Sequence, residues 1–260
     1  MKRLLLTSVI IGAIAGLLVG GFHNLFTVPV MERAIVLEEQ RSAEAMPAPA
    51  GEEAPSTDVA LGVQRIGMAL GTMIYGAILG LVFAAGFVIL QRTAPRWPII
   101  WVAVAVGALG FWSISLFPFI KYPLNPPGVG DEGTLLARQL GQTLFIIISA
   151  VAIAVVLDMI RRVNLQFSEF SARRTWYGVT LIAYAALAVI MVLVFPGNPD
   201  PVPVPIDLLE LFRALTVAGQ FLVWILLSVG GALALMWQQR TAPGQPTDNF
   251  RAAGEVGSGA

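Results

Sequence analysis

The chain has 260 residues, of which 57% are hydrophobic and only 12% are charged, with 16 basic and 16 acidic residues in balance. An ordinary soluble domain carries about 25% charged residues, so this chain cannot cover a water-facing surface, and its composition excludes a soluble globular protein. The mean hydropathy of +0.78 indicates an integral membrane protein.

Six long apolar runs follow one another along the chain. Each is close to the roughly 20 residues that a helix needs to cross about 30 Å of hydrocarbon. In lipid every backbone N–H and C=O must be satisfied internally, which favours helix in each run. The sequence therefore predicts an all-α integral membrane protein, with a single transmembrane domain over residues 1–240 and a flexible cytoplasmic tail over 241–260. The expected helices of this six-helix bundle are about 4–30, 66–90, 98–120, 140–160, 177–196 and 211–237.

The first run begins like a secretory signal peptide, because two basic residues precede "LLLTSVIIGAIAGLLVGG". Its apolar stretch is longer than the usual 7 to 15 residues, and the small-residue pair Ala43/Ala45 lies too far downstream for normal cleavage. We therefore expect it to be retained as the first helix.

Glycines at four-residue spacing occur in the first two runs, and small residues at this spacing let membrane helices approach closely. We expect these glycines to form helix contact surfaces and assign them no chemistry. They are Gly12, Gly16 and Gly20 in the first run, and the pairs Gly67/Gly71 and Gly76/Gly80 in the second.

Residues 31–65 form the expected first external loop, which is acidic and contains "AMPAPAGEEAPST". Its middle is too polar and too rich in proline to form a core. One interpretation is a solvated linker. The other is an acidic external mouth that raises the local cation concentration.

The second external loop interrupts two apolar runs with "FIKYPLNPPGVGDEG", which spans 119–133. Prolines prevent the third helix from continuing, and glycines permit backbone angles closed to other residues, so we expect an ordered loop rather than a slack tether. A literal G-x-G-x-x-G is also present, but it lacks the preceding strand and following helix of a nucleotide site. The motif consists of Lys121, Tyr122, Pro123, Asn125, Pro126, Pro127, Gly128 and Gly130, followed by the acids Asp131 and Glu132.

Four residues with an imidazole or amide side chain lie within the apolar runs, where polar groups are costly and often mark a pathway. His23 is the one histidine, and imidazole is a ligand that suits cobalt, nickel and zinc; a hydrogen bond at the headgroup boundary is the alternative role. Asn24 adjoins it. For Gln142 and Gln220 we favour interhelical hydrogen bonds over metal ligation. The candidate metal ligands are thus His23 with the loop acids Asp131 and Glu132.

The ends of the first, third and fifth runs share a weak internal sequence repeat. Each ends in a phenylalanine and a proline, followed by acids and then an arginine. The bundle can accordingly be divided into three helical hairpins in the same orientation. Chance is the competing explanation, since external hairpin ends favour proline and arginine in any case.

Charge orients the six runs. With the N-terminus inside, the inner segments hold ten of the 16 basic residues and four of the 16 acids, and the outer segments hold the other six basic residues and twelve acids. The positive-inside rule then predicts that both termini are cytoplasmic. At the inner end of the fourth run, Asp158 precedes Arg161 and Arg162 by three and four residues, which predicts a salt-bridged helix end.

Little in the chain can carry out catalysis. The absence of cysteine removes thiolate metal sites and cysteine nucleophiles. One histidine rules out most paired-imidazole sites, and no phosphate-binding loop or nucleophile elbow has a fitting context. We expect no enzyme, no permanently bound cofactor and no nucleic-acid partner; the lipid bilayer is the partner that the composition implies.

Three segments carry a family resemblance: "FHNLFTVPVMERAIVLEE", "FPFIKYPLNPPGVGDEGTLLARQ" and "LFRALTVAGQFLVW". Together they resemble the CbtA family of cobalt transporter subunits, over nearly the whole chain up to about residue 238. "KYPLNPPGVGD" is the most specific part. The middle of the first external loop is not matched to the family, so no function is carried onto it.

The resemblance implies a component of the bacterial inner membrane that takes part in cobalamin-regulated cobalt uptake. It also implies pairing with a small CbtB-like protein that has one membrane helix and a histidine-containing end. That pairing fits the composition, because one histidine and no cysteine cannot build a borderline-soft metal site, and carboxylates alone do not distinguish cobalt from magnesium or calcium. Cobalt, or a similar divalent ion, would be transported cargo.

Two functions therefore compete. The chain is either a subunit of a divalent-metal uptake system, or a non-transporting membrane scaffold or assembly protein that docks a partner through its external loops. It contains no ATP-binding motif, so transport would be passive, driven by a gradient or membrane potential, or powered by another protein.

Overall fold

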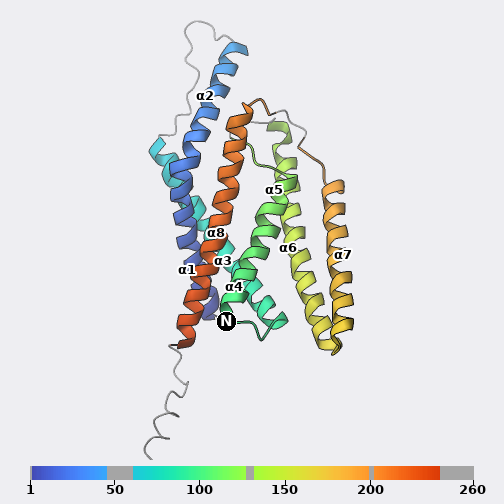
Figure 1. Ribbon diagram of the computed structural model, residues 1–260. Coiled ribbons are helices and arrows are strands. Elements are labelled where there is room, and N and C mark those ends of the chain that lie inside the picture. The colour runs from blue at the N-terminus through green and yellow to red at the C-terminus, as the bar shows by residue number, and fades with distance from the viewer. Residues whose placement is uncertain (1, 46–60, 127–131, 199–201, 241–260) are drawn as a thin grey trace, which may run out of the picture.

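A computed structural model describes residues 2–45, 61–126, 132–198 and 202–240 of the chain (Figure 1). All regular elements in these ranges are helical, and six helices are long and apolar enough to cross a membrane. The predicted all-α bundle is confirmed. The start of the first helix and the end of the last lie at the same end of the bundle, the terminal end, and residues 122–126 and 132–134 lie at the opposite, or loop, end. The spans are Lys2–Arg41, Arg65–Thr93, Ile99–Lys121, Leu135–Gln166, Phe170–Val194 and Ile206–Arg240.

Two of the six spans are composite helices. The first consists of α1 (Lys2–Phe22), a π-helical turn η1 (His23–Thr27) and α2 (Val28–Ala45). The third consists of α4 (Ile99–Gly110), a π-helical turn η2 (Phe111–Leu116) and α5 (Phe117–Lys121). The remaining helices are α3 (Leu61–Thr93), α6 (Leu135–Gln166), α7 (Phe170–Val194) and α8 (Ile206–Arg240), and a short 3-10 turn η3 (Glu132–Thr134) precedes α6.

Prolines account for both π-helical turns. A proline inside a helix has no N–H, and its ring clashes with the carbonyl four residues earlier. The backbone before Pro29 and before Pro118 is wound more loosely, so that Val28 N–H bonds to the carbonyl of His23, and Phe117 N–H bonds to that of Trp112. Each bond spans five residues, which is the spacing of a π-helix. The chain passes both prolines without breaking the helix.

The first helix is longer than the sequence predicts. Instead of ending near residue 30, it continues as α2 to Ala45, so residues 31–45 of the expected external loop are helical. The reason is packing: Val30 and Ala34 of α2 form a buried cluster with Leu208 and Phe212 at the start of α8. The apolar run ends near residue 30, but the helix has a second apolar surface to bury beyond it.

The first two spans approach each other most closely. A methyl group on Gly76 would overlap the carbonyl oxygen of Gly12, and one on Gly80 would overlap that of Ser8. A methyl on Gly16 would likewise overlap the Thr72 carbonyl oxygen. The predicted glycine contact surface is therefore confirmed for Gly12, Gly16, Gly20, Gly76 and Gly80. It is wrong for Gly67 and Gly71, because a Cβ at either position would meet no atom within 4 Å.

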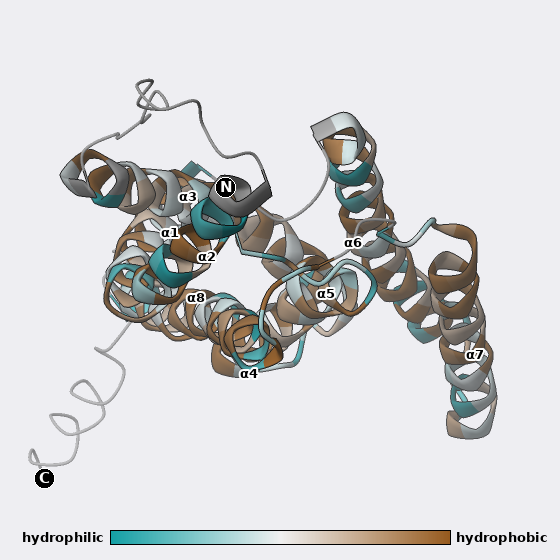
Figure 2. Ribbon diagram, turned by 90° about the horizontal axis from the view of Figure 1, so that it is seen from above, coloured by the Kyte–Doolittle hydropathy of each residue, from teal (hydrophilic) through white to brown (hydrophobic). Residues whose placement is uncertain are grey.

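The last helix, α8, holds the bundle together. It packs on α1 and α4 and contacts both π-helical turns. Trp224 and Leu227 of α8 are buried with Phe83 of α3 and Val102 of α4. Figure 2 shows α7 at the edge of the bundle beside α6, away from α8. The third of the expected hairpins is therefore not a packed pair, whereas α1 and α3 form the tightest pair.

At the terminal end, α3, α6 and α7 are joined by polar contacts. Thr93 Oγ1 donates to the carbonyl of Leu157 (3.3 Å), and the Tyr177 hydroxyl bonds to the Asn164 side chain. Asp158 forms salt bridges with Arg161 (3.0 Å) and Arg162 (2.6 Å), as the spacing predicts.

Substituting Gly76 tests the closest helix contact. Gly76→Ala should lower the free energy of unfolding by about 1–3 kcal/mol, because the added methyl forces α1 and α3 apart. Thermal unfolding of the purified protein in detergent measures the change. Gly71→Ala is the matched control on the same helix; it should leave stability unchanged or raise it by up to about 1 kcal/mol through helix propensity. Equal loss of stability in both variants would contradict the assignment.

Candidate functional site

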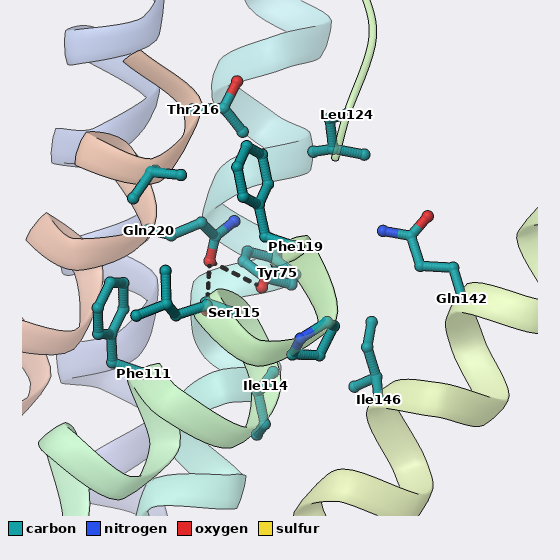
Figure 3. Close-up of a pocket in the computed structure, with 13 residues that line it drawn as sticks. Tyr75, Phe111, Ile114, Ser115, Phe119, Leu124, Gln142, Ile146, Thr216 and Gln220 are labelled. Carbon is teal, nitrogen blue, oxygen red and sulfur yellow. Dashed lines mark hydrogen bonds between the residues drawn. The ribbon is translucent and has the colours of Figure 1, made fainter. Parts of the chain in front are cut away.

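A polar cavity lies between α3, η2, α5, α6 and α8 (Figure 3). Its volume is about 90 Å³, which gives room for about three water molecules. Gln220 lies about nine residues, or roughly 14 Å, from the start of the apolar run at residue 211, so the cavity reaches well into the hydrocarbon layer. Its polar lining residues are Tyr75, Ser115, Gln142, Thr216 and Gln220.

A chain of hydrogen bonds crosses one wall of the cavity. The Trp224 indole N–H donates to Ser115 Oγ (3.1 Å), and the Ser115 hydroxyl donates to Gln220 Oε1 (3.0 Å). The Tyr75 hydroxyl donates to the same Gln220 oxygen (3.1 Å). Because an indole nitrogen can only donate, Ser115 Oγ is the acceptor in the first of these bonds and keeps its own hydrogen for Gln220. The Gln220 side chain joins α8 to α3 and η2.

Small residues near Trp224 determine where this wall of the cavity lies. Gly110 of α4 has no side chain, and a Cβ there would overlap the Trp224 ring, so the indole lies directly against α4. From that position its N–H reaches Ser115 in the π-helical turn that follows α4. Sequence reasoning identified Gln220 but missed Tyr75, Ser115 and Thr216. Single hydroxyls in apolar helices usually bond to their own backbone, as Thr216 does to the Phe212 carbonyl (2.8 Å), so they give no distinctive signal.

Gln142 differs from Gln220. Its side chain, from α6, lines the opposite side of the cavity, but it makes no hydrogen bond to any residue that the structure describes. The expected interhelical hydrogen bonds are thus present for Gln220 and are not seen for Gln142. The amide of Gln142 is available to whatever enters the cavity.

His23 lies in η1 and contacts α8. Its Nδ1 lies 2.8 Å from Thr27 Oγ1, and the other edge of the ring lies against Gly219, where a Cβ would overlap Nε2. Its neighbour Asn24 donates to the Gly20 carbonyl (2.9 Å) and to the Arg65 carbonyl of α3 (3.4 Å). The buried Oδ1 of Asn24 has no hydrogen-bond partner among the described residues.

The first part of the loop motif is attached to two different helices. Lys121 donates to the Val192 carbonyl of α7 (2.8 Å), and the Tyr122 hydroxyl donates to the Pro196 carbonyl just after α7 (2.8 Å). Burial raises the pKa of Tyr122, so this hydroxyl remains a donor at neutral pH. The Tyr122 ring packs edge-on against Phe145 of α6. Residues 121–122 are therefore fixed to α6 and α7.

The next two residues of the motif are held by α8. Arg213 donates to the Leu124 carbonyl (3.2 Å) and to Asn125 Oδ1 (2.8 Å). The Asn125 side-chain oxygen thus accepts a bond from a helix 88 residues away in sequence. Pro123 is half-buried, and Pro126 is buried. Leu124 also lines the polar cavity, so the loop borders it.

Several predicted site residues cannot be placed. Pro127, Gly128, Gly130 and Asp131 lie outside the described residues, as does the side chain of Glu132. Within the described ranges, no group of three or more His, Cys, Asp or Glu side chains is arranged to hold a metal ion. His23 is therefore not joined to carboxylates by any described contact, and the predicted ligand set stays a prediction.

Two glutamine substitutions test the hydrogen-bond assignment. Gln220→Leu removes an acceptor shared by two interhelical bonds and should lower the free energy of unfolding by about 1–2 kcal/mol. Gln142→Leu removes no described bond and should change it by less than about 0.5 kcal/mol. Thermal unfolding in one detergent compares them, and equal destabilisation by both would show that the cavity wall is assigned incorrectly.

Comparison with known proteins gives one family. The model of the family described as "Probable cobalt transporter subunit (CbtA)" matches residues 1–238, which include all six spans and the polar cavity. No curated protein and no solved structure matches the chain. Because the family match covers nearly all of the 260 residues, the chain belongs to the CbtA family of probable cobalt transporter subunits.

Proposed function

We propose that this protein is the membrane-spanning subunit of a system that takes up cobalt, or a similar divalent metal ion, across the bacterial inner membrane. The observation that carries the proposal is the family match over all six spans. A polar cavity inside the helix bundle, lined by residues of five helical elements, supports it.

We further propose that a small histidine-bearing membrane protein is the partner. Cobalt is a borderline ion that favours imidazole ligands, and the chain supplies one histidine and no cysteine. Nδ1 of His23 lies at Thr27 Oγ1 and Nε2 lies against Gly219, so ligation of a metal by this ring requires one of these two contacts to open. Further imidazoles from a partner would complete a coordination shell that His23 alone cannot form.

Orientation follows from charge and aromatic residues together. Four of the six tryptophans are exposed at the terminal end: Trp97, Trp101, Trp176 and Trp237. Exposed tryptophans gather at membrane–water interfaces, so they support a membrane boundary at this level. Of the basic residues in the described ranges, nine lie at this end and six lie in the opposite segments. We therefore propose that both termini are cytoplasmic and that the loop end faces outward.

A reporter fused to the C-terminus tests this orientation. A fusion that is active only in the cytoplasm should be active, and one that is active only outside should be silent, because each interfacial basic residue favours the inner side by about 1 kcal/mol and the excess is collective. A fusion at residue 125, in the loop, should give the opposite pattern. Activity of the external reporter at the C-terminus would reverse the assignment.

Metal uptake tests the function itself. Cells that express this chain together with a small histidine-bearing membrane partner should accumulate radioactive cobalt, and cells that express either protein alone should accumulate several-fold less. In the same assay His23→Ala and His23→Gln should reduce uptake equally at unchanged protein abundance, because glutamine keeps hydrogen bonding but not imidazole coordination.

The two competing functions give different results. Normal binding of the partner without any cobalt accumulation would favour the membrane scaffold. Full transport by His23→Gln, with the wild-type chain active, would instead keep the transporter and reduce His23 to a packing role.

A further inference from the structure

The polar cavity has a lining that selects a particular kind of occupant. Its polar groups are hydroxyls and amides, and none of its lining residues is Asp, Glu, Lys, Arg or His. A divalent ion that lost its water here would meet no anionic ligand to replace the hydration shell, and transfer of a bare charge into such surroundings is prohibitive. An ion in this cavity must therefore keep its water.

The hydrogen-bond directions suit a hydrated cation. Water molecules around a cation direct their hydrogens outward, so the surrounding wall must accept hydrogen bonds. The Tyr75 hydroxyl gives its hydrogen to Gln220, and the Thr216 hydroxyl gives its hydrogen to Phe212, which leaves oxygen lone pairs on both for the cavity. Gln142 adds an amide whose oxygen has no described partner. The available volume, about 90 Å³, is that of about three water molecules, which is part of a hydration shell rather than all of it.

Among the described residues, the cavity that adjoins the polar one is apolar. A second cavity of about 250 Å³ lies between α3, α4, α6 and α8, and its lining is almost entirely apolar. Ile114 of η2 lines both cavities. Trp224, whose indole N–H bonds to Ser115 of the polar cavity, lines the apolar one. The polar environment therefore stops at the level of these two side chains.

We propose that the polar cavity is a water-filled binding site that receives the hydrated divalent cation and contacts it through its water shell. This inference rests on the proposed function for the identity of the ion. It places ion entry among α3, η2, α5, α6 and α8, bordered by Leu124 of the loop motif, and it gives Gln142 a direct role as a water-contacting group.

Thiol accessibility tests whether the cavity holds water. The chain has no cysteine, so a single introduced cysteine reports without background. Thr216→Cys lines the cavity, and Ala218→Cys, two residues along α8, is exposed on the outer surface of the bundle. Only a thiolate in water reacts with a charged thiosulfonate reagent. In lipid nanodiscs, where both membrane faces are accessible, Thr216→Cys should react at least tenfold faster, and equal rates would overturn the inference.

Cobalt uptake tests whether the ion uses the cavity. Gln142→Leu should lower the initial uptake rate at least fivefold at unchanged abundance, although it breaks no described bond. Thr143→Val, which removes an exposed polar side chain one residue along α6, is the matched control and should transport normally. If the wild-type chain with its partner takes up no cobalt, the proposed function fails, and this inference fails with it. If the wild type transports and Gln142→Leu transports equally well, this inference alone is overturned.

Discussion

Pro29 and Pro118 each remove a backbone N–H from a helix that must cross lipid, where no water can replace the lost bond. The chain meets this constraint with a five-residue π-helical bond just before each proline. A π-helical turn widens the helix and rotates the side chains that follow relative to a regular α-helix. His23 and Ser115 both lie in these turns, and both turns contact α8. The polar residues of the bundle interior are thus positioned by the same two prolines.

The central position of α8 follows from its small and large residues together. Gly219 leaves room for the His23 ring, and Trp224 fits against Gly110 of α4. Between them, the side-chain oxygen of Gln220 accepts hydrogen bonds from the hydroxyls of Tyr75 and Ser115. One turn of α8 therefore receives a polar side chain from the first, second and third spans. A rotation of α8 would disturb all of these contacts at once, which couples the polar cavity to the packing of the whole bundle.

The general architecture could be predicted from the sequence because apolar length is a direct physical requirement of a membrane span. Helix ends could not, because α2 continues past its apolar run by packing on α8, which is distant in sequence. Glycine spacing alone did not distinguish Gly76, at the closest contact with α1, from Gly71, which faces open space. The two glutamines were equally ambiguous: only the positions of Tyr75 and Ser115 show that Gln220 is bonded and that Gln142 is not. Such differences depend on the rotation of each helix, which periodicity in an almost uniformly apolar run does not reveal.

The polar cavity has an uncharged lining, and the chain has few side chains that can ligate a metal. Both features limit how well this protein alone can distinguish one divalent ion from another. A cavity that contacts an ion through water recognises the charge and the hydrated size of that ion. Hydrated cobalt and hydrated magnesium differ little in either property. Discrimination between cobalt and magnesium requires nitrogen ligands that replace water, and this chain has one imidazole, outside the cavity lining. Recognition of the metal and its passage through the membrane are therefore separate tasks. If His23 and a partner's imidazoles select the ion by binding it directly, the cavity can remain uncharged, and weak outer-shell contact then favours release over trapping.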